Sequence, residues 1–225
     1  CKEKLVDIKQ LAKTKKMKLH TINTGYFKLD GGAMFGVVPK TIWQKLNTPD
    51  SDNLCTWAMR CLLIEDEKQL ILIDCGLGNK QDTKFFGHYQ PHGDDTLEKS
   101  LNKLGFTHND ITDVILTHLH FDHCGGAVVR EGDKLLTAFP NATYWSNEQH
   151  WQWAIEPNAR EKASFLKENI LPIQESGQLK FAESGSNAVH PSIALQTVSG
   201  HTESMFIPHI TYKGYNLIYC ADLFP

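Results

Sequence analysis

Four side chains that can bind a metal ion lie within six residues, directly after an apolar run of the chain. Residues 118–123 read His-Leu-His-Phe-Asp-His, and the preceding residues 113–117 have the length and β-branched content of a buried strand. Alternate residues of an extended chain point to the same side, so His118 and His120 face one way while Leu119 faces the protein. The pattern predicts a strand that ends in a loop of converging metal ligands.

The residue types in this loop suit zinc, which binds neutral imidazole nitrogens and carboxylate oxygens at about 2.0 to 2.2 Å. Asp122 and His123 can face a second ion beside the first, and Asp122 can also accept a proton from water that a cation has made acidic. The alternative interpretation is a surface loop in which these side chains meet by chance. Other histidines have no such neighbours, and we expect them at the surface or hydrogen-bonded: His20, His88, His92, His108, His150, His190 and His209.

The loop resembles the His-x-His-x-Asp-His signature of the metallo-β-lactamase superfamily, and three further segments resemble that family in the same order. Residues 70–78 resemble its strand with an Asp-x-Gly turn, residues 198–202 its Gly-His-Thr element, and residues 217–222 its strand that ends in a bridging aspartate. The resemblance implies a dinuclear site with one ion held by His118, His120 and His201, the other by Asp122 and His123, and Asp222 as the bridge.

Three implied site residues also have simpler interpretations. Asp74 could form a turn, whereas the resemblance implies that it lies beside the ligands and supports them. Asp222 could cap the turn after its strand, and His201 could be an ordinary loop residue. Relatives often read His-Thr-Pro-Gly-His where residues 201–205 read His-Thr-Glu-Ser-Met, so the subfamily stays open.

The final metal ligand of the family has no counterpart in this sequence. In relatives a histidine follows the bridging aspartate, whereas no histidine follows His209 here and the sequence ends at Pro225. We therefore expect a chain that is incomplete at its C-terminus. The alternative is an authentic departure, in which the second metal keeps Asp122, His123 and Asp222 but lacks a nitrogen donor.

The order of predicted elements indicates an α/β fold. Residues 54–65 and 69–75 form a predicted hairpin, residues 96–104 a helix closed by Gly105, and residues 147–170 one or two helices interrupted by Pro157. Further predicted strands start at Met17 or cover residues 142–145, 193–198, 205–212 and 215–221, the last two joined by a turn at Lys213-Gly214. The resemblance identifies this arrangement as the αβ/βα four-layer sandwich of the metallo-β-lactamase fold.

Composition predicts one globular hydrolase domain, residues 17–225, after a basic N-terminal extension, residues 1–16. Hydrophobic residues make up 41% of the chain, and no apolar run approaches the ~20 residues that a bilayer span requires. With seven lysines against Glu3 and Asp7, residues 1–18 carry +5, which leaves −8 for the remainder of a chain whose net charge is −3. The acidic domain offers no basic patch for nucleic acid.

The six cysteines predict a reducing environment. None forms a Cys-x-x-Cys pair, and several occur in strand-like runs, where a free thiol packs as a small apolar group. A cytoplasmic location is therefore favoured. The alternative is a lipid-anchored protein attached through Cys1, or a periplasmic one.

Residues 30–39 form a glycine-rich segment that resembles the loop overhanging the metals in lactonase-like relatives. We expect Met34 and Phe35 to contact substrate, with core packing as the alternative. Trp151 and Trp153 lie two apart in a predicted helix and cannot share one face, so one of them is expected to line the cleft or a partner surface.

The nearest resemblance is to the lactonase-like branch, close to N-acyl-homoserine lactonases and similar esterases. It implies a hydrolase that uses two divalent metal ions, zinc by default or manganese, iron or cobalt, to open a lactone or cleave an ester of a small molecule. Asp122 is the expected proton shuttle. Alternatives on the same frame are a thioesterase of the glyoxalase II type, a β-lactamase and a phosphotriesterase. An alternative outside enzymes is a non-catalytic, metal-bound ligand sensor.

Overall fold

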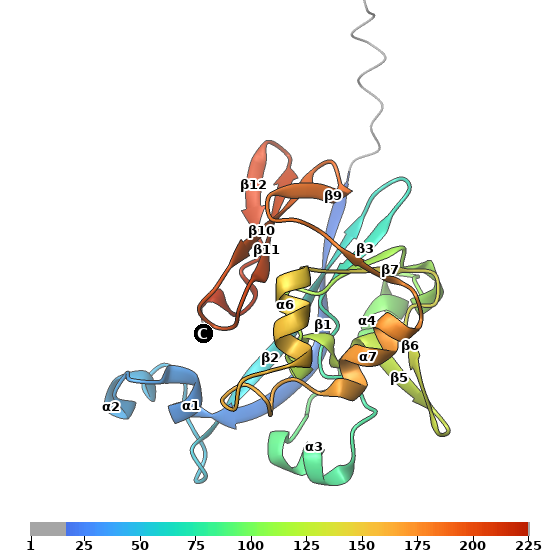
Figure 1. Ribbon diagram of the computed structural model, residues 1–225. Helices are drawn as coiled ribbons and strands as arrows, with labels where there is room; N and C mark the ends of the chain where they lie inside the picture. The colour runs from blue at the N-terminus through green and yellow to red at the C-terminus, as the bar shows by residue number, and fades with distance from the viewer. Residues whose placement is uncertain (1–16, 225) are drawn as a thin grey trace, which may run out of the picture.

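Two β-sheets lie face to face in the computed structural model, which describes residues 17–224 (Figure 1). The predicted N-terminal extension and Cys1 lie outside the described residues. The larger sheet has the order β1-β2-β3-β4-β7-β8. Its strands are β1 (Lys18–Asp30), β2 (Leu54–Glu65), β3 (Leu70–Ile73), β4 (Asp113–Ile115), β7 (Thr143–Ser146) and β8 (Leu179–Phe181).

The smaller sheet comes from the C-terminal part of the chain and has the order β12-β11-β10-β9. Its strands are β9 (Ser186–His190), β10 (Ile193–Val198), β11 (Met205–Tyr212) and β12 (Tyr215–Ile218), and a separate hairpin consists of β5 (Val128–Glu131) and β6 (Lys134–Thr137). The helices are α1 (Gly31–Phe35), α2 (Lys40–Trp43), α3 (Thr83–Tyr89), α4 (Leu97–Lys103), α5 (Phe121–Cys124), α6 (Glu148–Ile155) and α7 (Lys167–Glu175). Helices α1 and α2 project from one side of the molecule (Figure 1).

Strands β3 and β4 are short and buried on both faces, because each face packs on a different layer. Leu72 and Val114 point into a core shared with residues of α4, α6 and α7. Ile71, Ile73 and Ile115 point to the other side, into a core shared with β10 and β11. The alternation of strand side chains therefore places the larger sheet between a helix layer and the smaller sheet, and the predicted α/β sandwich is confirmed.

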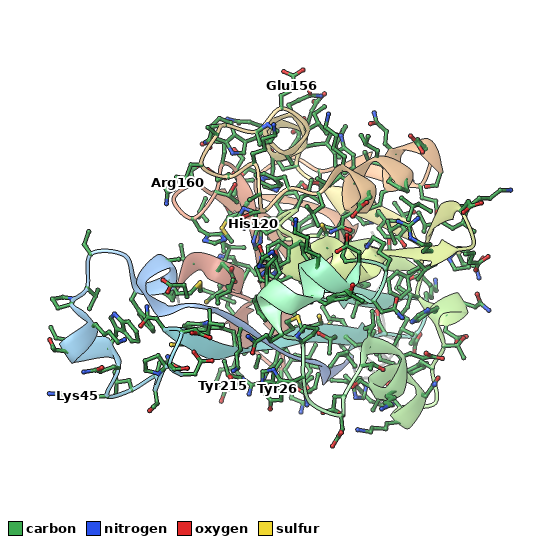
Figure 2. All side chains as sticks on the ribbon, turned by 90° about the horizontal axis from the view of Figure 1, so that it is seen from below. Tyr26, Lys45, His120, Glu156, Arg160 and Tyr215 are labelled. Carbon is green, nitrogen blue, oxygen red and sulfur yellow. The ribbon has the colours of Figure 1, made fainter. Side chains whose placement is uncertain are left out.

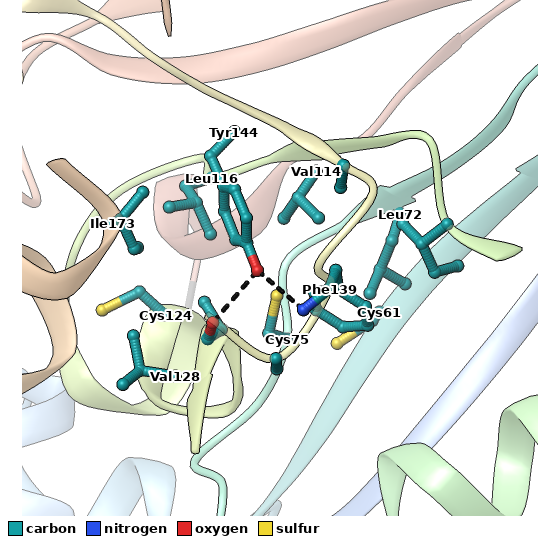
Figure 3. Packing of buried hydrophobic residues seen from close by; sticks show 14 of the residues in the cluster. Cys61, Leu72, Cys75, Val114, Leu116, Cys124, Val128, Phe139, Tyr144 and Ile173 are labelled. Atoms are coloured by element: carbon teal, nitrogen blue, oxygen red, sulfur yellow. Dashed lines mark hydrogen bonds between the residues drawn. The ribbon is translucent and has the colours of Figure 1, made fainter. Parts of the chain in front are cut away.

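A buried tyrosine forms hydrogen bonds to two backbone groups in the core on the helix side (Figure 3). The Tyr144 hydroxyl donates to the carbonyl oxygen of Ala127 at 3.1 Å and accepts the backbone N–H of Phe139 at 3.0 Å. Both polar functions of this fully buried side chain are thus satisfied, as burial requires. Figure 3 also shows Cys75 and Cys124 within this core, where they have no disulfide partner.

The direction of the central strands determines where a site can form. Strands β3, β4, β7 and β8 are parallel to their neighbours in this part of the sheet, so their carboxyl ends meet at one edge. Asp74 directly follows β3, and the histidine-rich loop follows β4. Ligands of open α/β sheets bind at such carboxyl ends.

Several predicted elements are confirmed. Strands β2 and β3 form the hairpin, and α4 begins after Thr96, whose side chain accepts the N–H of Lys99. Strands β11 and β12 are joined at Lys213 and Gly214, whose φ values of 51° and 82° are those of a type I′ turn.

Other boundaries were wrong. Strand β12 ends at Ile218 and not at Ala221. The predicted region 147–170 does hold two helices with Pro157 between them, but the second continues to Glu175. Part of the glycine-rich segment 30–39 forms the short helix α1. Helix α3, the β5–β6 hairpin, β8 and β9 were not predicted.

Four of the described cysteines are buried and Cys220 is partly buried, and none of these five forms a disulfide. Residues 17–224 contain no helix with the length and apolar character that a bilayer span requires.

Candidate metal centre

The histidine-rich loop is held by the segment that follows β3. The N–H of Asp74 donates to Ile115 O at 3.0 Å, and the N–H of Cys75 donates to His123 O at 2.8 Å. Gly125 and Gly126 allow a close approach here, since a Cβ on either would overlap the carbonyl oxygen of Leu77 or of Cys75. The loop that carries the candidate ligands therefore packs directly on the chain around residues 74–77.

Three imidazoles converge at this edge of the sheet. One ligand atom each of His118, His120 and His201 lie within 4.8 Å of one another, although His201 comes from the loop between β10 and β11. The Nε2 of His201 is 3.0 Å from Nδ1 of His120. The Nε2 of His118 is buried and has no hydrogen-bond partner among residues 17–224. Buried nitrogens are normally paired, so this atom fits the role of a metal ligand.

A second group shares His118 and adds His123 and Asp222, with ligand atoms again within 4.8 Å of one another. Asp222 Oδ1 is 3.1 Å from His123 Nε2, and Asp222 Oδ2 is 3.3 Å from His201 Nε2. Asp222 therefore lies between the imidazoles of both groups. Asp122 lies outside both groups, with its Oδ2 3.6 Å from His123 Nε2.

The two groups differ in charge. Burial and then the neighbouring imidazoles lower the pKa of His118 well below its usual range and that of His201 to about 4. Burial alone would also lower the pKa of His123, but the carboxylates of Asp122, Asp222 and Asp74 together raise it well above its usual range. The neutral imidazoles of His118 and His201 have lone pairs that can bind a cation.

The two aspartates beside His123 also have shifted pKa values. Burial raises the pKa of Asp122. Burial acts in the same direction on Asp222, but His123 and His201 outweigh it and lower the pKa of Asp222 to about 2. Asp222 is therefore an anion at neutral pH, whereas Asp122 binds a proton more readily than an exposed aspartate does.

Asp74 is linked by hydrogen bonds to a histidine of each group. Its carboxylate accepts the Thr117 hydroxyl at 2.8 Å and His123 Nδ1–H at 2.9 Å. Because the Thr117 hydroxyl donates to Asp74, its oxygen accepts Nδ1–H of His118, 3.1 Å away. One carboxylate thus assigns the proton of both rings to Nδ1 and leaves each Nε2 facing the site. Asp74 itself has a left-handed backbone, with φ of 61°.

Two residues near the ligands were not predicted to belong to the site. His150 on α6 is fully buried and contacts the loops of both His120 and His201, and burial lowers its pKa to about 4. Glu161 accepts the Thr202 hydroxyl at 2.7 Å, and its Oε2 is 3.9 Å from His120 Nε2. Both are single residues within a long predicted helical region, so the sequence carries no local signal for them.

A cavity of about 900 Å³ is lined by four of the five candidate ligands, His120, His123, His201 and Asp222. Met34 lines it, together with Phe27 and Trp57, whereas Phe35 stacks on Trp43 at 4.9 Å and is not among the lining residues. Figure 2 shows His120 close to the middle of the molecule and Arg160, which also lines the cavity, farther toward its edge.

Neither tryptophan of α6 lines the cavity, so the prediction that one of them would is wrong. Trp151 is buried in the core, and Trp153 packs against the same core while its Nε1–H donates to Glu161 at 3.1 Å. Cys124 is also a core residue, since its thiol donates to Leu119 O and burial raises its pKa to about 12. A protonated thiol of this kind is a poor metal ligand.

Comparison with known proteins places this geometry in a family. The sequence model of the metallo-β-lactamase superfamily matches residues 60–225. The chain belongs to this superfamily. Its histidine and aspartate groups suit a divalent cation, in keeping with the nitrogen and oxygen ligands that zinc prefers.

Among relatives of known function, the N-acyl homoserine lactonase AiiA of Bacillus thuringiensis subsp. kurstaki is 29% identical over 168 residues, which cover 69% of this chain and 59% of the relative. The chain thus spans less than two thirds of the length of this relative. A lactonase of Bacillus cereus is 28% identical over 160 residues, covering 67% of this chain and 56% of the relative.

Solved structures show the same similarity. A probable metal-dependent hydrolase from Staphylococcus aureus has a TM-score of 0.85 and 31% identity, covering 95% of this chain and 75% of that one. The dizinc quorum-quenching lactonase AidC, solved with a product, has a TM-score of 0.71 and 26% identity, covering 94% of this chain and 73% of that one.

Proposed function

We propose that this protein is a metal-dependent hydrolase that opens a lactone, or cleaves an ester, of a small molecule. The observation that carries the proposal is the convergence of five side chains, four of which line one cavity. They are His118, His120, His201, His123 and Asp222. The first group would hold one divalent ion and the second group another. Zinc is the favoured ion for this ligand set, with manganese, iron or cobalt as alternatives.

Divalent cations in such a site supply Lewis-acid chemistry, since they make water more acidic and polarise a carbonyl oxygen. The protein supplies proton transfer. Asp122 lines the cavity, and burial raises the pKa of its carboxyl group. We assign to it the proton released by the attacking water and the return of that proton to the leaving alkoxide.

The substrate class follows from the cavity and from the relatives. A volume of about 900 Å³ lies within the range of small-molecule sites, and the apolar side chains of Phe27, Met34 and Trp57 line one part of it. Relatives named as lactonases support a lactone as the substrate. Met34 would contact the apolar part of such a molecule, whereas Phe35 would act by holding Trp43.

A substrate panel tests the proposal. The zinc-loaded chain is assayed for hydrolysis of an N-acyl-homoserine lactone, a thioester, a β-lactam and a phosphotriester, with the chelator-treated chain as control. We expect the lactone to have the highest kcat/KM and the chelator to abolish turnover. Faster hydrolysis of another substrate would select the corresponding alternative, and bound zinc without turnover of any substrate would indicate a ligand sensor.

A further inference from the structure

His150 connects two loops that each carry metal-binding histidines. It lies on α6, and its side chain is completely buried, with 0% exposure. Its Nε2 accepts the backbone N–H of Leu119 at 2.9 Å, and Leu119 stands between two histidines of the first ligand group. Its Nδ1 lies 2.6 Å from the carbonyl oxygen of Glu203, two residues after His201.

The two partners determine where the ring carries its proton. A backbone carbonyl can only accept a hydrogen bond, so Nδ1 of His150 must donate to Glu203. A backbone N–H can only donate, so Nε2 must be unprotonated toward Leu119. One neutral imidazole therefore satisfies both backbones at once.

These contacts link the loop of His120 to the loop of His201. A second link between the two segments is the N–H of Phe206, which donates to Thr117 O at 2.7 Å. The backbone around His118 and His120 is thus attached to the chain around His201 at two places. Without His150, the N–H of Leu119 and the C=O of Glu203 would lose their buried partner, which would favour separation of the loops.

We propose that His150 is a positioning residue of the metal centre, which keeps His118, His120 and His201 converged before an ion binds. The inference rests on the metal centre of the proposed function and is independent of the substrate. Residues that orient metal ligands typically change metal affinity by about 10–100-fold when they are replaced.

Zinc affinity, measured by competition with a chromophoric chelator, tests this role. His150→Leu removes both hydrogen bonds, and we expect its tighter zinc ion to bind about 10–100-fold more weakly than in the wild type. His150→Gln keeps one donor and one acceptor, so its affinity should lie between the two. The visible spectrum of the cobalt-loaded His150→Leu chain should also differ from that of the wild type, because the ligand angles change.

His190→Leu is the matched control. His190 is also buried, its Nε2 is 2.9 Å from Asp66, and its Nδ1 accepts the N–H of Ser192, and neither of these partners belongs to a ligand loop. This variant should lower the melting temperature of the metal-free chain without changing zinc affinity or the cobalt spectrum.

Unchanged zinc affinity in His150→Leu, or an equal loss in His190→Leu, would overturn the inference. If His150→Leu does not fold, His150→Gln decides: weaker binding than wild type supports the role, and equal binding refutes it. A wild-type chain that binds no zinc would refute the metal centre itself, an outcome that needs no variant and is therefore distinguishable.

Discussion

The two ligand groups that share His118 are prepared for a cation in different ways. The first contains imidazoles alone, and burial lowers the pKa of both His118 and His201. The second contains an ion pair, because acidic neighbours raise the pKa of His123 while Asp222 stays ionised. His118 and His201 can therefore bind an ion without releasing protons, whereas the second group must release the proton of His123.

The two groups therefore contribute differently to one site. Neutral, buried nitrogens form a ready binding position, and the carboxylates of Asp122 and Asp222 concentrate negative charge beside it. In the metal-free protein, the proton on His123 balances part of that charge. Each prediction below changes one side of this comparison.

The largest effect is expected from His118→Ala, because His118 contributes to both groups. We expect loss of both ions and a fall in turnover greater than the ~10–100-fold found for groups that only orient a ligand. Elemental analysis of metal content and the lactone assay measure the two effects. His88→Ala, at an exposed position on α3, is the control, and metal content equal to that of the control would contradict the assignment.

Asp122→Asn should separate proton transfer from folding. The amide has the same shape but cannot accept the proton, so kcat should fall by about 10²–10⁴-fold. The melting temperature should change little by comparison. Burial raises the pKa of Asp122 and so disfavours its charged form, and a neutral amide of the same shape therefore costs little stability. Steady-state kinetics and thermal unfolding provide the two measurements, and full turnover in this variant would remove Asp122 from the mechanism.

Asp74→Asn should weaken the second group more than the first. Asparagine tolerates the left-handed backbone of residue 74, but it replaces a charged acceptor of His123 Nδ1–H by a neutral one. We expect the weaker zinc ion to lose about 10–100-fold in affinity. Chelator competition resolves the two ions, and an equal loss for both would mean that the link through Thr117 matters as much.

The smallest expected effect is the change of zinc affinity with pH. Metal binding displaces the proton of His123, so affinity for the second ion should rise by up to about tenfold per pH unit below the pKa of that histidine. Affinity for the first ion should vary less above the pKa of about 4 of His201. Zinc titrations at several pH values across neutrality measure both, and parallel slopes would contradict the comparison.

The local part of the site could be predicted from the sequence. The spacing of His118 and His120 and the β-branched run before them are properties of adjacent residues, and Leu119 does face the core as its position requires. Asp74 and Asp222 carried weaker signals, since an aspartate after a strand commonly forms a turn. Only the order of motifs along the chain distinguished them.

The supporting contacts could not be predicted, because they depend on how distant elements pack. His150 meets Glu203 only where α6 lies against the loop after β10, and Glu161 belongs to an irregular segment between α6 and α7. Phe35 turned toward Trp43 because a one-turn helix replaced the expected loop. Helix α3 was missed because it has only seven residues, and its apolar side chains Phe85, Phe86 and Tyr89 are partly buried against the core, which is too short a pattern to show a helical period.

The contact of Gly125 and Gly126 with the carbonyl groups of Leu77 and Cys75 limits how this centre can be reused. A graft of the hexapeptide 118–123 alone onto a foreign scaffold would transfer most of the candidate metal ligands. It would not transfer the segment 74–77 against which their loop packs. A successful transplant needs the turn at residues 74–77 and both glycines as well, since a Cβ on either glycine would overlap a carbonyl oxygen of that turn.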